Sequence, residues 1–155
     1  MQTVREELNI SPEEFLEMGR IGALYYEQGN LEKAETIFEG LVELDPLSAD
    51  AHSALGALYT QTGRDDEALV HLNKSAELNP DQIAPYVNRA EIRIRQQRME
   101  EAVADLKQAI ELDPAEKDPG ANRARAIVLG LKEAFEARGA YNQTTAENPG
   151  NGRQK

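Results

Sequence analysis

Few side chains in this sequence have the types and spacing that catalysis requires. The chain has 155 residues, two histidines and no cysteine, which excludes thiol nucleophiles, thiolate metal sites and disulfides. His52 has no acid and nucleophile pattern around it, and its neighbour Ser53 would point about 100° away on a helix. We therefore expect His52 to fill a packing position, and we predict no catalytic residue.

Two further patterns could do chemistry. Asp65 and Asp66 stand just before an apolar periodic segment, where carboxylates favour the positive end of a helix dipole. Helix capping is the preferred interpretation, and metal binding is the alternative. The glycines form neither a GxGxxG pattern nor a Walker loop, so nucleotide binding has no support. The sequence thus predicts no metal, no cofactor and no enzyme.

The charge of the chain limits its partners. Seventeen Lys and Arg residues against 28 Asp and Glu give a net charge of −11. Nucleic acids and anionic membranes both require clustered positive charge, so we expect the chain to bind neither. The first fifteen residues lack the apolar centre of a signal peptide, and no apolar run is long enough to span a bilayer. These features favour a cytoplasmic protein.

An internal repeat organises the sequence. Three prolines fall 34 residues apart, and each closes a similar phrase: VELDP, AELNP and IELDP. Small and large apolar residues keep the same step in three further columns, Gly22/Gly56/Ala90, Ala34/Ala68/Ala102 and Phe38/Leu72/Leu106. Within each unit the apolar spacing is helical, with a polar turn such as Gln28-Gly29-Asn30 in the middle. Each unit is therefore predicted to be a helix, a tight turn and a second helix.

This pattern resembles the tetratricopeptide repeat (TPR), which has small residues at its eighth and twentieth positions and proline at its thirty-second. The three units are 15–48, 49–82 and 83–116. The resemblance implies an all-α solenoid of three repeats. The third unit departs from the pattern, because Arg89 and Arg93 stand where apolar residues are usual.

The segments outside the repeats are predicted to protect the ends of the stack. Residues 1–14 form a lead-in that ends in a helix cap, with Ser11 as N-cap, Pro12 at the first helical position and Glu14 completing a capping box. Residues 117–138 are expected to be a capping helix, with Ala126, Leu129 and Ala134 on its apolar stripe. Residues 139–155 are expected to be a disordered tail. Arg89 and Arg93 are expected either to pair with Glu133 or Glu136 of the capping helix or to be solvated.

The resemblance also implies that the first helix of each repeat lines a concave groove. Its second, fifth, ninth and twelfth positions share one helical face by their spacing. That face is mostly small and apolar, which suits an extended apolar segment seated around Tyr26 and Ile94. The alternative is that a narrow superhelix half-buries this face itself. The predicted groove residues are Leu16, Gly19, Ala23, Tyr26, Asp50, Ser53, Ala57, Thr60, Ala84, Val87, Glu91 and Ile94.

One well-known TPR function can be tested by residue. TPR cochaperones hold a C-terminal carboxylate with Lys and Asn in the first unit, Asn in the second, and Lys and Arg in the third. The matching positions here are Gly19, Ala23, Ala54, Ala84 and Asn88, and none has the required residue. We therefore expect no binding of EEVD-type chaperone tails.

The sequence is also similar to the class II chaperones of bacterial type III secretion systems, over roughly residues 15–137. The similarity lies in ALYYEQGNLEKAETIFEGLVELD, HSALGALYTQTG and the pair Ala90-Glu91, although His52 and Ser53 replace two aromatic residues usual in that family. It implies a groove that cradles a segment of a hydrophobic translocator, and a homodimer through the N-terminal region. We predict a chaperone-type binding protein. A TPR scaffold for a multiprotein assembly, such as pilus or envelope machinery, is the alternative.

Overall fold

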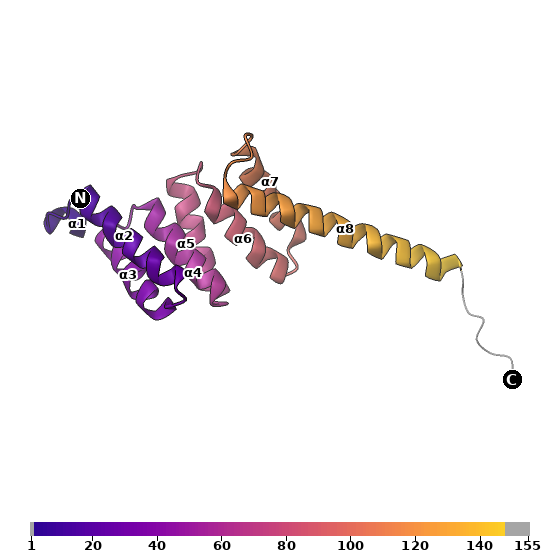
Figure 1. The fold of residues 1–155 in the computed structure, drawn as a ribbon, viewed down its shortest axis with the longest axis horizontal. Helices are drawn as coiled ribbons and strands as arrows, with labels where there is room; N and C mark the ends of the chain where they lie inside the picture. The colour runs from indigo at the N-terminus through magenta and orange to yellow at the C-terminus, as the bar shows by residue number, and fades with distance from the viewer. Residues whose placement is uncertain (1, 148–155) are drawn as a thin grey trace.

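The computed structural model describes residues 2–147, with side chains through Ala140. All regular structure in this range is helical. It comprises α1 (Val4–Glu7), α2 (Pro12–Glu27), α3 (Leu31–Leu44), α4 (Ala49–Gln61), α5 (Asp65–Leu78), α6 (Ile83–Arg95), α7 (Met99–Glu111) and α8 (Pro119–Glu147). Helices α2 to α7 form three pairs that stack in chain order, and α8 follows the last pair (Figure 1). The predicted all-α solenoid of three repeats is confirmed.

The first repeat begins with the predicted capping box. The Ser11 hydroxyl accepts a hydrogen bond from the Glu14 backbone N–H at 3.1 Å, and the Glu14 carboxylate accepts one from the Ser11 N–H at 2.8 Å. The bond from the Ser11 backbone lowers the pKa of Glu14. Pro12 occupies the first helical position, where a missing N–H costs nothing. The start of α2 is therefore fixed by local contacts.

Within each repeat, a small residue on the first helix lets the second helix approach closely. A Cβ built on Gly22 would lie 2.5 Å from the Phe38 ring, and one on Gly56 would lie 2.7 Å from Leu72. In the third repeat, Ala90 and the facing Leu106 are both fully buried. The 34-residue column of small residues is thus explained by helix packing.

The third repeat buries a cluster of charged side chains between its two helices. Arg89 on α6 donates two hydrogen bonds to the carboxylate of Asp105 on α7, at 2.9 and 2.6 Å, and Arg93 donates a third at 2.6 Å. Asp105 is only 4% exposed. The expectation that these arginines pair with Glu133 or Glu136, or are solvated, is wrong, because Asp105 lies opposite them within the same repeat.

In the second repeat, two histidines join α4 to α5. The Nδ1 atoms of His52 and His71 are 3.0 Å apart, and His52 Nε2 is 2.9 Å from the carbonyl oxygen of Pro46. Because that carbonyl can only accept, neutral His52 must carry its proton on Nε2, and its Nδ1 accepts from His71. His52 therefore has the predicted packing role, and it also ties α5 to the loop before α4.

Helix α8 is longer than predicted. Its buried positions are Ala121 and Ala124, and Ile127 and Leu131 also pack against the core of the third repeat. The predicted stripe through Leu129 is wrong, since Leu129 is 56% exposed.

The end of α8 also differs from the prediction. The helix continues to Glu147, so residues 139–147 of the predicted disordered tail are helical. The sequence places no proline between Pro119 and Pro149, and an isolated glycine such as Gly139 costs only about 1 kcal/mol in a helix. Residues 148–155 of the predicted tail lie outside the described part of the chain.

The buried ion pairs predict a large effect of one substitution. Asp105→Ala should lower the free energy of unfolding by about 3 kcal/mol, because it leaves Arg89 without a carboxylate and Arg93 with only its longer pair to Glu101. Glu101→Ala is the matched control, since the carboxylate of Glu101 pairs with Arg93 and Arg98 but is 46% exposed. It should cost less than about 1 kcal/mol. Urea unfolding followed by circular dichroism measures both values, and equal losses would contradict this account.

The histidine pair predicts lower stability in acid. Burial, followed by the nearby charge of His52, lowers the pKa of His71, although Glu67 and Glu39 act in the opposite direction. The unfolded chain therefore binds more protons than the folded chain below about pH 6.5. The contribution of neutral His71 to the free energy of unfolding is fully present above that pH and is lost as the pH drops. We expect the urea midpoint to fall between pH 7 and pH 5, and His71→Asn to flatten this profile. An equally steep profile in the variant would show that other groups cause the loss.

Candidate peptide-binding groove

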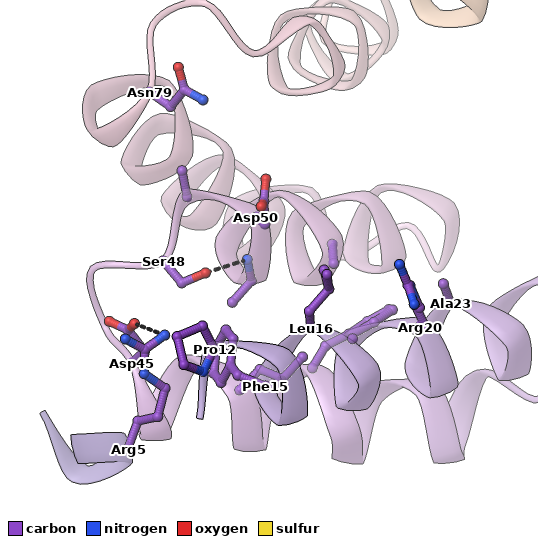
Figure 2. Close-up of a pocket in the computed structure, with 16 residues that line it drawn as sticks. Arg5, Pro12, Phe15, Leu16, Arg20, Ala23, Asp45, Ser48, Asp50 and Asn79 are labelled. Atoms are coloured by element: carbon purple, nitrogen blue, oxygen red, sulfur yellow. Dashed lines mark hydrogen bonds and ion pairs between the residues drawn. The ribbon is translucent and has the colours of Figure 1, made fainter. Parts of the chain in front are cut away.

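An apolar hollow lies between α2 and α4 on the N-terminal half of the stack. We call it the cup, and its volume is about 650 Å³. Its apolar lining comes from Phe15, Leu16, Gly19 and Ala23 of α2, Phe38 and Leu41 of α3, and Ala49, Ala51 and Ala54 of α4. Arg5, Pro12, Arg20, Asp45, Ser48, Asp50 and Asn79 complete it (Figure 2). A hollow of this size and character can accept large apolar side chains.

Local contacts at one end of the cup hold its wall in place. Arg5, from α1, forms an ion pair with Asp45 at 3.2 Å, and its guanidinium lies 5.1 Å from the centre of the Phe15 ring. The Ser48 hydroxyl caps α4 by accepting a hydrogen bond from the Ala51 N–H at 3.2 Å (Figure 2). The short helix α1 and the loop between α3 and α4 are therefore tied to the cup.

The rim of the cup carries polar groups that can meet a peptide backbone. Arg20 is exposed on α2, and its only ion pair among the side chains of residues 2–140 is with the exposed Glu17. Asp50 is exposed on α4 and accepts a hydrogen bond from the Gln82 side chain at 2.6 Å. Arg20 can therefore donate to a peptide carbonyl, and Asp50 retains acceptor capacity for an N–H.

Gly19 deepens the cup without being required by helix packing. A Cβ built there would meet only Leu41, at an ordinary contact distance of 3.8 Å. Gly22, one turn further along α2, has no such space because the Phe38 ring lies against it. The missing side chain of Gly19 thus opens space on the groove side.

The structure divides the twelve predicted groove residues into three groups. Four line the cup: Leu16, Gly19, Ala23 and Asp50. Five lie outside the cup and are exposed or partly buried: Tyr26, Ala57, Ala84, Glu91 and Ile94. Three are buried: Ser53 (7% exposed), Thr60 (7%) and Val87 (3%). At these three positions the stack buries the inner face, which is the outcome that the alternative prediction described.

Neither Tyr26 nor Ile94, around which pockets were expected, lines the cup. Tyr26 packs against the core of the first two repeats, and Ile94 packs against that of the third. Burial raises the pKa of Tyr26. The nearby charge of Arg123 lowers this pKa by a smaller amount, and that of Glu91 raises it. Glu91 and Arg123 are themselves joined at 2.6 Å, which brings α8 onto the inner helix of the third repeat. An ion pair therefore lies in the half of the groove where apolar pockets were predicted.

Several residues of the cup were not predicted. Arg5 comes from the lead-in, and Asp45 and Ser48 come from a loop between repeats. The helical spacing used to predict the groove covers only the first helix of each repeat, so it cannot identify these residues. An Arg before the capping box and the Asp-Pro phrase after α3 were visible in the sequence, but nothing in it showed that they meet.

Other kinds of site find no support in residues 2–147. Among the side chains that the structure describes, which end at Ala140, no group of three or more His, Asp or Glu is placed to hold a metal ion. No helix in that range is long and apolar enough to span a membrane.

Comparisons with known families identify the class of protein. Tetratricopeptide repeat families match residues 25–91 and residues 83–116, which together span more than half of the chain. The chain is a tetratricopeptide repeat protein. The comparison with curated protein sequences found no match.

Solved structures with the same fold include type III secretion proteins. A type III secretion complex from Aeromonas hydrophila has a TM-score of 0.75 at 21% identity, and covers 87% of this chain and 91% of its own. The chaperone SycD of Yersinia enterocolitica, in complex with a peptide of the translocator YopD, has a TM-score of 0.69 at 22% identity and covers 83% and 97%. The first TPR of Spaghetti, bound to an HSP90 peptide, has a TM-score of 0.66 at 23% identity and covers 79% and 97%. The resemblance to secretion chaperones is thus confirmed for the fold.

The different surroundings of the glycines give a direct test of the cup. Gly19→Ala should leave the free energy of unfolding unchanged or raise it by about 0.5–1 kcal/mol, because alanine favours helix and meets no clash. Gly56→Ala should instead lower it by about 1–3 kcal/mol, because the new methyl group overlaps Leu72. Thermal melts of the two variants measure the difference. A loss of stability in Gly19→Ala would mean that Gly19 serves packing.

Proposed function

We propose that this protein is a peptide-binding chaperone of the type III secretion kind. Its cup and the adjoining concave groove hold an extended, largely apolar segment of a partner protein. The observation that carries the proposal is the cup itself: an open, apolar hollow on the inner side of a TPR stack, with Arg20 and Asp50 on its rim. Apolar side chains of the partner would enter the hollow, and the rim would bond to its backbone.

The structural comparisons support this choice of partner. SycD binds a peptide of a translocator, and its fold matches most of this chain. The resemblance to secretion chaperones implies a hydrophobic translocator as the partner, and the apolar segment of such a partner would need cover from water until export. In this proposal the protein supplies that cover by binding alone, without catalysis or a cofactor.

The cup argues against a partner held by its C-terminal carboxylate. Gly19, Ala23 and Ala54, which occupy three of the positions that hold such a carboxylate in cochaperones, all line the cup and offer no charge or side-chain hydrogen bond. An apolar segment fits these residues better than an EEVD tail does. The shared fold with Spaghetti therefore does not extend to the HSP90 peptide as partner.

A TPR scaffold for a multiprotein assembly is the second candidate. It is favoured by one observation: a second apolar surface lies between α7 and α8, far along the stack from the cup. Gene neighbourhood separates the two proposals, since translocator and secretion-apparatus genes beside this one would favour the chaperone.

Filling the cup should abolish binding of the partner. Gly19→Leu adds a side chain that extends into the hollow, while leucine at a helical position favours the fold over glycine. We expect the main partner captured from the native organism to be lost, and the affinity for its purified apolar segment to fall at least about tenfold.

Gly40→Leu is the matched control for this experiment. It makes the same change in α3, where a Cβ would meet nothing within 4 Å. This variant should bind as the wild type does. Equal binding by both variants would refute the cup as the site, and capture of a partner with no apolar segment would refute the chaperone proposal.

A further inference from the structure

A second apolar hollow lies at the other end of the stack, between α7 and α8. We call it the α7–α8 groove, and its volume is about 520 Å³. Lys132 and Arg138 are its charged lining residues, and no carboxylate among the side chains of residues 2–140 lines it. It shares no lining residue with the cup. Its apolar lining residues are Met99, Val103, Val128, Leu131, Ala134 and Phe135.

The 34-residue repeat continues into α8. Ala124 stands 34 residues after Ala90, and both are fully buried. Helix α8 packs on α6 and α7, just as α6 packs on α4 and α5. It therefore takes the place of the first helix of a fourth unit, although it runs on to Glu147 where the earlier units turn back (Figure 1). Equivalent positions can thus be compared from one unit to the next.

One repeat position holds a cation that is paired with carboxylates in the earlier units. Arg64 pairs with Glu35 of the preceding unit and with Glu67 of its own unit. One unit later, the equivalent arginine pairs with Glu101 at 2.6 Å. The residues at this position, 34 apart, are Arg64, Arg98 and Lys132.

Around Lys132 both of these carboxylates are replaced by apolar residues. Val103 stands two repeats after Glu35, and Phe135 stands one repeat after Glu101. Both line the groove together with Lys132, and Phe135 is 81% exposed. Lys132 keeps only a long, exposed pair with Glu136, at 3.9 Å. The groove thus presents an exposed apolar surface beside a cation that lacks the acidic partners of the earlier units.

We infer that the α7–α8 groove binds an amphipathic helix of a partner protein, with apolar residues along one face and Asp or Glu beside them. An exposed apolar hollow on a stable protein indicates an interface. The apolar face of the partner helix covers Val103 and Phe135, as in other complexes that seat a helix in a groove. Its acidic residues pair with Lys132 and with Arg138, which has no ion pair among the side chains of residues 2–140.

The lining of the groove favours a helix over an extended segment. Lys132 and Arg138 can donate hydrogen bonds but cannot accept them, and the other lining side chains are apolar. An extended backbone would leave N–H groups without acceptors here, whereas a helix bonds its own. The cup differs in this respect, because its rim offers Asp50 as an acceptor.

The charges of the groove disfavour a second copy of this chain as the occupant. In a two-fold arrangement each patch meets itself, so Lys132 and Arg138 of both copies would come to one interface. An acidic helix of another protein avoids this repulsion. The inference is independent of what the cup binds.

A tryptophan placed in the groove tests this inference on the full chain. The natural sequence has no tryptophan, so Phe135→Trp gives a fluorescent reporter for this site alone. The probes are two model helical peptides of about 16 residues with the same leucine stripe, which differ only in having Glu or Lys beside it. The Glu peptide should shift the emission to shorter wavelength and bind at least about tenfold more tightly than the Lys peptide. The net charge of −11 favours the opposite order, so such a result must come from the cations of the groove.

Charge reversal supplies the second arm of the experiment. In the tryptophan variant, Lys132→Glu combined with Arg138→Glu should reverse the preference between the two peptides. Lys33→Glu combined with Lys74→Glu serves as the control, because it makes the same change in net charge on α3 and α5, outside the groove. This control should keep the preference for the Glu peptide.

Four results would overturn the inference: no saturable shift with either peptide, equal or tighter binding of the Lys peptide, the same response in both charge variants, or an emission that moves with protein concentration when no peptide is present. The last result would assign the groove to a second copy of the chain. A peptide bound at the cup does not contact this tryptophan, so the inference and the proposed function fail separately.

Discussion

The contact between the two helices of each repeat determines the rest of this structure. Gly22 and Gly56 leave room for Phe38 and Leu72, whose atoms lie within 3 Å of where a Cβ would stand. Because the paired helices are this close, the two helices of a repeat pack as one unit, and these units stack in chain order. Part of the concave side is then lined by residues that packing does not require. Gly19 is the clearest of them, and its missing side chain becomes part of the cup.

The contact between the two helices of a repeat can be apolar, polar or charged, provided that the facing residues on both helices change together. One column of the repeat holds Ile37, His71 and Asp105, 34 residues apart. In the second repeat His71 meets His52, and in the third Asp105 meets two arginines. Each solution gives its buried polar side chains partners within the same repeat, although the Nε atom of Arg93 has none. The helix pairs therefore keep one geometry, although only the first relies wholly on apolar contact.

The two ends of the stack present different surfaces. At the N-terminal end, α1 and the loop after α3 wall off the cup, so that an inner face becomes a bounded hollow with a polar rim. At the C-terminal end, α8 covers the third repeat and then continues alone, which leaves an apolar groove beside it.

The sequence by itself determined the repeat, because helix periodicity, turn residues and the 34-residue columns are local properties of the chain. It therefore predicted the three helix pairs, the capping box and the presence of a capping helix. The spacing of the inner face likewise located Leu16, Gly19, Ala23 and Asp50. Only the tertiary structure decided which inner residues are open, since the stack buries Ser53, Thr60 and Val87. It also decided the partners of Arg89, the orientation of α8, and the meeting of Arg5 with Asp45, because each depends on how segments far apart in sequence are brought together.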